Sequence, residues 1–436
     1  MMTWSQRFRL KAYVGRSLWI IPLGCVVLAV LASIVVPEID QASEADLTFP
    51  YGVGGAIAAL SAIAGGMITF TGFVFTILLT NIQFGSSQFS PRLLSPILRE
   101  KSVKVAFGSF VATFIYALLL LSSVARQSDP EGVPTFSVTF AVLLLLLSVV
   151  TFLKLIDQVG HQLRVTSVLS GVADVGRELI DRIYPDPAPP VDRFAGQQAE
   201  EPAPGAARTI RHAGNSRILQ AADFEGLVET AREADAVVVL IPAIGDYVRY
   251  GTPLFEVLEA GAAIDDSRLF GSVAFGDERT IERDLAYVFR MLVDIAERAL
   301  SPAVNDPTTA VEALDEIEDL LCRLGTRELA IDRLCDTDGH LRVSRRVPGW
   351  EDYLSLALTE IRQYGQGSVQ VDRRVLAVLE TLLGVVGPSR RPAVDEQLRL
   401  LTESVQRGFP QPEQPLAAVA DRQGIGSPNR VGGTAP

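Results

Sequence analysis

The sequence predicts a polytopic α-helical membrane domain with four transmembrane helices, followed by a C-terminal α+β cytoplasmic domain. Two observations lead to this fold class. The chain of 436 residues is 48% hydrophobic, and its apolar runs of membrane-spanning length all lie in the first 156 residues. Residues 1–156 contain 10 Lys/Arg against 7 Asp/Glu, a net charge of +3, whereas residues 157–436 contain 29 against 44, a net charge of −15. A nearly neutral, apolar part is therefore joined to an acidic part with the composition of a water-soluble domain.

Four apolar runs reach the roughly 20 residues that cross the hydrocarbon core of a bilayer. They are about Leu18–Val36, Val53–Thr80, Val105–Ala125 and Phe136–Ile156. The first run follows a basic segment, as in a signal peptide. It is long for a signal peptide and lacks a small-residue cleavage site, so we expect an uncleaved transmembrane helix.

The charges of the connecting segments predict the orientation in the membrane. Lys and Arg are present before the first run, after the second and after the fourth, whereas the loop after the first run has four acidic residues and no Lys or Arg. Basic residues are retained on the cytoplasmic side of a membrane. We therefore expect a multi-pass protein of the bacterial cytoplasmic (inner) membrane with its N- and C-termini in the cytoplasm.

The second run is unusual because no charged residue lies between Asp46 and Arg92. We expect one helix, which at 1.5 Å per residue extends about 42 Å over residues 53–80, more than a hydrocarbon core of about 30 Å. Its small and weakly polar residues fall within an arc of about 80° at the helical repeat. They are Ala58, Ala62, Gly65, Thr69, Gly72, Thr76, Thr80, Gln83 and Ser87.

Two interpretations of this small-residue face are open. Small residues let membrane helices approach closely, so the face can serve packing alone. Alternatively, its hydroxyl and amide groups line a water-filled path in an oligomer. The candidate residues are Gly65, Thr69, Gly72, Thr76, Thr80 and Gln83. No Asp, Glu, Lys, Arg or His lies inside a span, apart from end residues such as Lys154, which argues against a proton-coupled pump or a carrier of charged substrates.

The C-terminal part divides into four expected segments. Residues 157–215 are expected to form a helical extension and a Pro-rich linker, and residues 216–275 a small β-rich module with turns at Gly245-Asp246 and Gly251-Thr252. Residues 276–408 are expected to form a mainly helical domain with a β-hairpin, beginning with an amphipathic helix over Glu278–Leu300. Residues 409–436 are rich in Pro, Gly and Gln and are expected to be a disordered tail.

A polar loop follows that amphipathic helix. It contains Ser301, Asn305 and Asp306 and ends at Pro307. Asp306 and Pro307 are typical of the N-cap and first position of a new helix, which favours a simple corner between two helices. The alternative is a polar pocket in which Asn305 and Asp306 bind a ligand.

Recognisable catalytic and metal-binding motifs are absent from the sequence. The chain has three His (His161, His212 and His340) and three Cys (Cys25, Cys322 and Cys335), and their spacing forms no metal, disulfide or nucleophile motif. We therefore assign no catalytic residue, cofactor-binding residue or metal ligand, and an enzyme is the least favoured class.

Two segments resemble a known family. One is Gly66-Met-Ile-Thr-Phe-Thr-Gly-Phe-Val-Phe75 with Ser86-Ser-Gln-Phe-Ser-Pro-Arg-Leu-Leu94, and the other is Arg279-Thr280 with the run from Asp294 to Ala310. They are similar to the bacterial predicted membrane protein family called domain of unknown function twenty-two fifty-four. The resemblance implies four membrane helices and a C-terminal soluble domain, and it implies no established activity.

The sequence favours a channel- or transport-like protein with a cytoplasmic regulatory domain. The alternative is a membrane-anchored scaffold or sensor with no transport activity. The lipid bilayer and further copies of the chain are the expected partners, and the small ion or ligand is unknown. The acidic C-terminal part repels nucleic-acid phosphates, so we expect no nucleic-acid partner.

Overall fold

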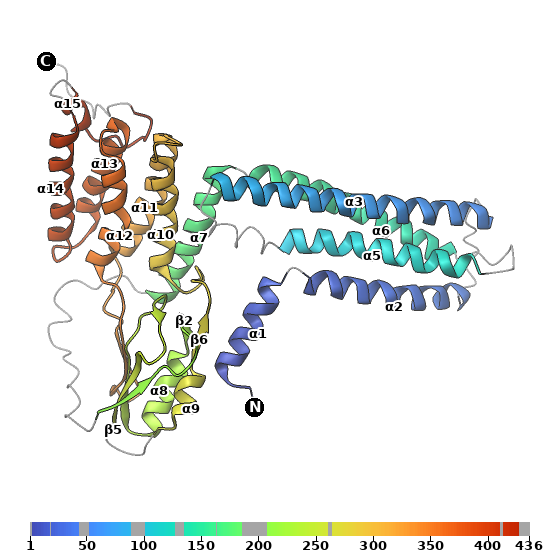
Figure 1. Ribbon diagram of the computed structural model, residues 1–436, viewed down its shortest axis with the longest axis horizontal. Coiled ribbons are helices and arrows are strands. Elements are labelled where there is room, and N and C mark those ends of the chain that lie inside the picture. Colours follow the sequence, from blue (N-terminus) through green and yellow to red (C-terminus); the bar gives the residue numbers. More distant parts are fainter. Residues whose placement is uncertain are drawn as a thin grey trace. The chain divides into compact units, whose positions relative to one another are not determined.

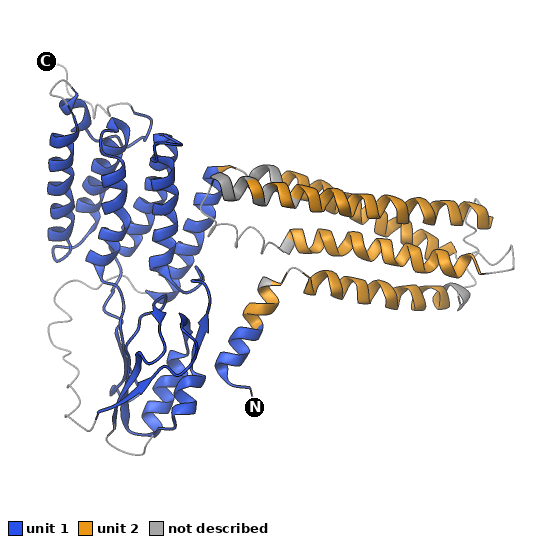
Figure 2. Ribbon diagram, in the orientation of Figure 1, with its two compact units in different colours: residues 1–10, 165–436 blue, residues 11–164 orange. Residues whose placement is uncertain are grey.

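The chain forms two compact units in the computed structural model, which describes residues 2–17, 19–42, 52–88, 101–126, 135–162, 164–184, 207–259, 264–409 and 413–426. Residues 11–164 form the four-helix unit, and residues 1–10 together with 165–436 form the α/β unit (Figure 2). The predicted order of four candidate membrane-spanning helices followed by a region of helices and sheets is confirmed. Each unit is described by itself.

The four-helix unit contains the four predicted spans as α2 (Ile20–Ala42), α3 (Gly52–Gln88), α5 (Lys101–Val124) and α6 (Thr135–Gln162) (Figure 1). All four helices are long and apolar enough to cross a membrane. The uncharged second run forms a single helix of 37 residues, as expected. Helix α1 (Trp4–Arg16) precedes the first span and belongs to both units, because residues 1–10 cluster with the C-terminal part of the chain.

Helix α5 is the centre of the four-helix unit and contacts α2, α3 and α6. Gly108 brings α2 close, since a Cβ atom at this position would lie 2.9 Å from Cys25 Sγ. The hydroxyls of Thr113 on α5 and Ser148 on α6 lie 2.9 Å apart and are buried. Close backbone approach and an interhelical hydrogen bond therefore hold the helices together.

The α/β unit contains two sheets, with α8 (Phe224–Glu233) and α9 (Asp266–Gly271) beside them. The larger sheet has the order β1-β5-β3-β8-β7 and the smaller one the order β4-β2-β6. The strands are β1 (Ala207–Arg211), β2 (Arg217–Ala222), β3 (Ala236–Leu240), β4 (Tyr247–Val248), β5 (Pro253–Glu259), β6 (Val273–Gly276), β7 (Arg333–Cys335) and β8 (Leu341–Arg345). Their apolar side chains form a buried core that includes Leu219, Val238, Phe255 and Val343.

The other helices of the α/β unit pack in a separate layer (Figure 1). They are α7 (Val165–Ile183), α10 (Leu285–Ala299), α11 (Pro307–Leu324), α12 (Trp350–Tyr364), α13 (Val369–Val385), α14 (Arg391–Gly408) and α15 (Gln414–Ala417). Arg177 attaches α7 to α11 by ion pairs of 2.5 Å with Glu316 and 2.6 Å with Asp319. Helix α7 is thereby an integral part of this unit.

Three segment boundaries differ from those expected. Strand β1 lies in the segment predicted as linker, whereas residues 185–206 of that segment are outside the described residues. Strand β8 pairs in parallel with β3, so the modules predicted for 216–275 and 276–408 share one sheet. Helix α10 begins at Leu285 rather than Glu278, because the side chain of Asp284 caps it by accepting a hydrogen bond from Tyr287 N.

The C-terminal tail also differs from expectation over residues 413–426, where a disordered segment was predicted. This segment contains α15 and continues along α13. The Asp421 carboxylate accepts hydrogen bonds from the backbone N–H groups of Gln423, Gly424 and Gly426. The Arg373 guanidinium donates to the carbonyls of Val419 and Gly426. These polar contacts order a segment whose larger apolar side chains, Leu416, Val419 and Ile425, are exposed. Residues 427–436 lie outside the described part.

Candidate functional site

The predicted small-residue face of α3 points away from the other helices of the four-helix unit. Its exposed members are Ala58, Ala62, Gly65, Thr69, Gly72, Thr76, Thr80 and Gln83. The opposite face is buried in the four-helix unit by residues that include Ala56, Leu60, Met67 and Val74. Ala, Gly and Thr therefore do not serve packing within one chain at these positions. The side chain of Ser87 lies outside the described residues.

The threonine hydroxyls on this face are already hydrogen-bonded. Thr69 donates to Gly65 O at 3.0 Å, Thr76 to Gly72 O at 3.0 Å, and Thr80 to Thr76 O at 2.9 Å. Each bond returns to the carbonyl four residues earlier in the same helix. Because the hydroxyls have partners, the face does not require contact with water and suits lipid or another protein surface equally.

The predicted polar loop is a capped corner between α10 and α11. Asp306 accepts hydrogen bonds from Thr309 N at 3.2 Å and from the Thr309 hydroxyl at 2.7 Å. Asn305 adopts the left-handed conformation, with φ of 49°, and its backbone N–H donates to Ser301 O. The Ser301 hydroxyl donates to Arg298 O at 2.7 Å. Capping therefore accounts for the polar groups of Ser301 and Asp306, and the loop from Pro302 to Asp306 is exposed.

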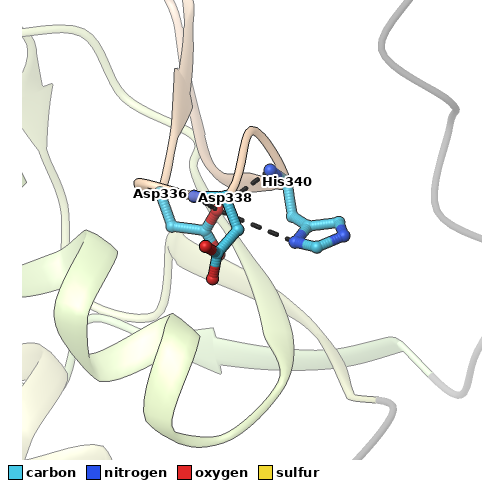
Figure 3. A group of neighbouring side chains, drawn as sticks. All are labelled: Asp336, Asp338 and His340. Carbon is cyan, nitrogen blue, oxygen red and sulfur yellow. Dashed lines mark hydrogen bonds and ion pairs between the residues drawn. The ribbon is translucent and has the colours of Figure 1, made fainter.

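A second polar group, Asp336, Asp338 and His340, lies at the turn between β7 and β8 (Figure 3). Carboxylates and imidazole are metal ligands. However, Asp336 Oδ1 accepts the backbone N–H groups of Asp338 and His340, and Asp336 Oδ2 pairs with the Arg342 guanidinium at 2.7 Å. The hydrogen bond from Arg342 is the main reason that the pKa of Asp336 is lowered. Asp336 thus organises the turn, and the positive charge of Arg342 opposes a metal ion there.

A small pocket inside the α/β unit brings together more ionisable side chains than the polar loop or the β7–β8 turn. Its volume is about 80 Å³. It lies where the end of α7, the N-terminal ends of α8 and α10, the ends of β3 and β8, and helix α12 converge. Its walls are largely apolar, with Phe224, Leu240, Ile244 and Val347 among them. Its polar lining consists of Tyr184, Arg283, Asp284, Arg345, Arg346 and Tyr353.

Two tyrosines form one polar wall of this pocket. The hydroxyls of Tyr184 and Tyr353 lie 3.3 Å apart, and both side chains are buried. Burial raises the pKa of both phenols, so both remain protonated hydrogen-bond donors in the physiological pH range.

Two arginines lining the pocket contact aromatic rings. Arg345 is partly buried, whereas Arg283 is exposed. The Arg345 guanidinium lies 4.2 Å from the ring centroid of Phe224, and its Nε donates to Ile331 O at 3.1 Å. The Arg283 guanidinium lies 5.9 Å from the Trp4 ring and 5.2 Å from the Phe8 ring, both on α1. Burial lowers the pKa of both arginines, yet guanidinium groups remain charged in proteins.

Asp284 is the acidic member of the lining. Its Oδ1 caps α10, and its Oδ2 is buried without a hydrogen-bond partner in the described structure, 3.8 Å from Arg279 Nη1. Burial raises the pKa of this carboxyl to about 6, and Arg279 partly opposes the shift. Its carboxyl group lies against Gly245, the first predicted turn of the β-rich module.

The sequence pointed to none of these pocket residues. Its six polar side chains come from four separate segments between Tyr184 and Tyr353, and no local spacing relates them. One residue that could have indicated this site in the sequence is Asp284, an N-cap residue type immediately before an apolar helix. The other was Arg345, a charge at the end of a strand that a parallel pairing brings beside Leu240.

Comparison with known proteins now places the chain. The family model described as "Predicted membrane protein (DUF2254)" matches residues 15–381. This chain belongs to that family. It is 30% identical over 416 residues to an uncharacterized protein of Mycobacterium tuberculosis and to one of Mycobacterium bovis, covering 93% of this chain and 79% of each relative. No solved structure matches the chain.

The DUF2254 segments quoted from the sequence occupy distinct places in the structure. The first begins within α3 at the exposed Gly66 and includes Met67 and Val74 on the buried face, and its residues 89–94 lie outside the described residues. Arg279 faces the buried carboxylate of Asp284, Asp294 pairs with Arg290 on α10 at 2.5 Å, and Asp306 caps α11. The second segment therefore lies just before α10 and includes its C-terminal end. The N-terminal end of α10 forms one side of the pocket.

Proposed function

We propose that this DUF2254 protein is a sensor anchored in the bacterial inner membrane, whose α/β unit binds a small molecule and passes the occupancy of its pocket to α1. One observation carries the proposal. Arg283 lines the pocket and also lies against the Trp4 and Phe8 rings of α1. The same side chain thus touches the binding site and the helix that leads to the membrane.

The contact at α1 is well suited to respond to a ligand. Trp4 and Phe8 are one helical turn apart, and their rings stack with centroids 5.3 Å apart. An exposed guanidinium on such rings contributes about 0.5–1 kcal/mol. A ligand that engages Arg283 weakens this contact. Helix α1 continues to Arg16, and the first candidate span begins at Ile20, so a change at Trp4 is carried toward the membrane.

The proposed topology has both termini in the cytoplasm. Residues 1–10 belong to the same compact unit as residues 165–436, which supports placing both ends of the chain on one side of the membrane. Four spans require the same arrangement. The Lys/Arg bias of the connecting segments favours the cytoplasm as that side.

Hydrogen exchange of the full-length protein in nanodiscs tests the link to α1. Arg283→Gln removes the guanidinium from the Trp4 and Phe8 rings. We expect the amides of residues 6–10 to exchange about fivefold faster, which corresponds to losing about 1 kcal/mol of local stability. Arg249→Gln, an exposed arginine outside the pocket, is the matched control and leaves these amides unchanged. Equal exchange in Arg283→Gln and wild type contradicts the proposal.

A second candidate function is a channel- or transport-like activity, favoured by the outward-facing small residues of α3. If several copies meet through this face, their Thr69, Thr76 and Gln83 side chains surround a common axis. Ion flux into proteoliposomes tests this function, with Thr76→Leu predicted to reduce the flux. Ile68→Leu alters an exposed apolar side chain on the same helix and serves as the control. Flux that is absent, or that Thr76→Leu leaves unchanged, removes this candidate.

A further inference from the structure

We propose that the pocket between Tyr184 and Arg345 binds an oxyanion, namely the carboxylate or phosphate group of a small metabolite. The inference rests on the proposed sensor function and names the class of ligand that the pocket takes. It follows from the charges, donors and size of the lining.

Arg345 favours an anionic ligand, because its charge is left without a carboxylate partner. Its Nε is bonded to Ile331 O, and no ion pair to Arg345 is formed by any residue of the described ranges. Asp332 acts on it only at longer range. The same unit supplies carboxylates directly to Arg177, Arg290, Arg342 and Arg374. Removing a guanidinium from water costs free energy unless an anion compensates it, so an unpaired cation lining a cavity favours an anionic ligand.

The balance of charge around the pocket also favours an anionic ligand. Arg283 and Arg346 line the same cavity as Arg345, and neither forms an ion pair within the part of the chain that the structure describes. Asp284 is the opposing charge, but its Oδ1 accepts a hydrogen bond from Tyr287 N and its Oδ2 faces Gly245 and Arg279. Asp223 acts on Arg283, and Asp332 on Arg345, only at longer range. Three cations against one engaged carboxyl in the lining therefore favour an anionic over a cationic ligand.

The remaining lining completes an oxyanion site. The Tyr184 and Tyr353 phenols are protonated, and because one hydroxyl donates to the other, the pair has one O–H group left to donate to a ligand. Guanidinium forks match the two oxygens of a carboxylate or phosphate. A cavity of about 80 Å³ has the room of roughly three water molecules, which suits one such group with a short apolar tail. Phe224 and Leu240 provide apolar surface for that tail.

Calorimetric titration of the full-length protein in phosphatidylcholine nanodiscs tests the inference at constant ionic strength. The probes are butyrate, inorganic phosphate and butyramide, which has nearly the shape of butyrate without its charge. We expect butyrate or phosphate to bind, identifying the carboxylate or phosphate source, and butyramide to bind at least about tenfold more weakly than the bound anion. Butyramide binding as tightly as butyrate, or an absence of binding by both anions, overturns the inference.

Variants locate the binding site. Arg345→Gln is expected to weaken anion binding about tenfold, and Arg345→Lys, which keeps the charge but loses the planar fork, to weaken it less. Arg333→Gln on the neighbouring strand removes an equal charge from an exposed position and is the control. Equal affinities for Arg345→Lys, Arg333→Gln and wild type place the anion elsewhere and overturn the inference, even if Arg345→Gln fails to fold.

Failure of this inference is distinguishable from failure of the sensor function. If the pocket prefers butyramide while Arg283→Gln still loosens α1, the ligand class is wrong and the sensor stands. If an anion binds through Arg345 while α1 exchange is insensitive to Arg283, the ligand class stands and the sensor function is wrong.

Discussion

Gly245 lies directly against the carboxyl group of Asp284. A Cβ atom built on Gly245 would be only 2.2 Å from Asp284 Oδ2, and the residue has a φ of 95°. The turn of the β-rich module and the N-terminal end of α10 are therefore in close contact, and this contact fixes one side of the pocket. Glycine is required here by both space and conformation.

Gly245→Ala is expected to destabilise the α/β unit. The left-handed backbone costs an alanine about 1 kcal/mol, and the overlap with Asp284 adds about 1–3 kcal/mol. Gly251→Ala is the matched control, since Gly251 also has a positive φ, of 77°, but has no atom within 4 Å of its Cβ position in the described structure. Chemical denaturation should show a clearly larger loss for Gly245→Ala, and equal losses would mean that the contact is not tight.

Chelation is expected to leave the stability of the β7–β8 turn unchanged, because Asp336 is engaged by protein groups. Asp336→Asn, which weakens the ion pair with Arg342, should lower the free energy of unfolding. Asp338→Asn, at an exposed position, should be nearly neutral. A drop in the thermal unfolding midpoint on adding EDTA, restored by a divalent cation, would show instead that this turn binds metal.

Asp372 makes stability depend on pH. It is 1% exposed, neither carboxylate oxygen has a hydrogen-bond partner among the described residues, and burial raises its pKa to about 7. The folded state therefore holds a proton that the unfolded state releases near its ordinary pKa of 3.8. The contribution of Asp372 to stability is greatest at low pH and declines as pH rises to about 7, by on the order of 2–4 kcal/mol.

Asp372→Asn should remove this part of the pH dependence and stabilise the protein at pH 8 relative to wild type. Asp395→Asn, on the exposed side of α14, is the control. Unfolding curves measured from pH 5 to pH 8 give the comparison. Parallel stability profiles for wild type and Asp372→Asn would show that Asp372 is ionised in the folded state throughout.

Self-association is expected to use the exposed glycines of α3. No atom of the described structure lies within 4 Å of a Cβ position at Gly65 or Gly72, so leucine at these positions should preserve the fold of one chain. It should weaken contact with a second copy, because small residues permit close helix approach. Gly108→Leu is the contrasting variant, since it meets Cys25 and Pro22 within the chain and should disrupt folding. Crosslinking yields unchanged by Gly72→Leu would argue against an interface on this face.

The sequence predicted the parts of the fold that local patterns determine. Four spans follow from apolar length, and the cap at Asp306 follows from residue type. The pairing of β8 with β3 was not predictable, because it joins residues about a hundred positions apart through backbone hydrogen bonds. The pocket depends on that pairing, which brings Arg345 beside Leu240. Its link to α1 depends on the contact between Trp4 and Arg283. Such non-local contacts leave no periodic signal in the sequence.

Hydrogen exchange with and without a bound anion tests the central claim most directly, namely that the pocket communicates with α1. Wild-type protein in nanodiscs is saturated with whichever of butyrate or phosphate binds, and exchange is followed at residues 345–347 and at residues 6–10. The account predicts slower exchange at 345–347 together with faster exchange at 6–10, and neither change in Arg345→Gln. Protection at 345–347 with unaltered exchange at 6–10 would contradict it, because the site would then be occupied without any effect on α1.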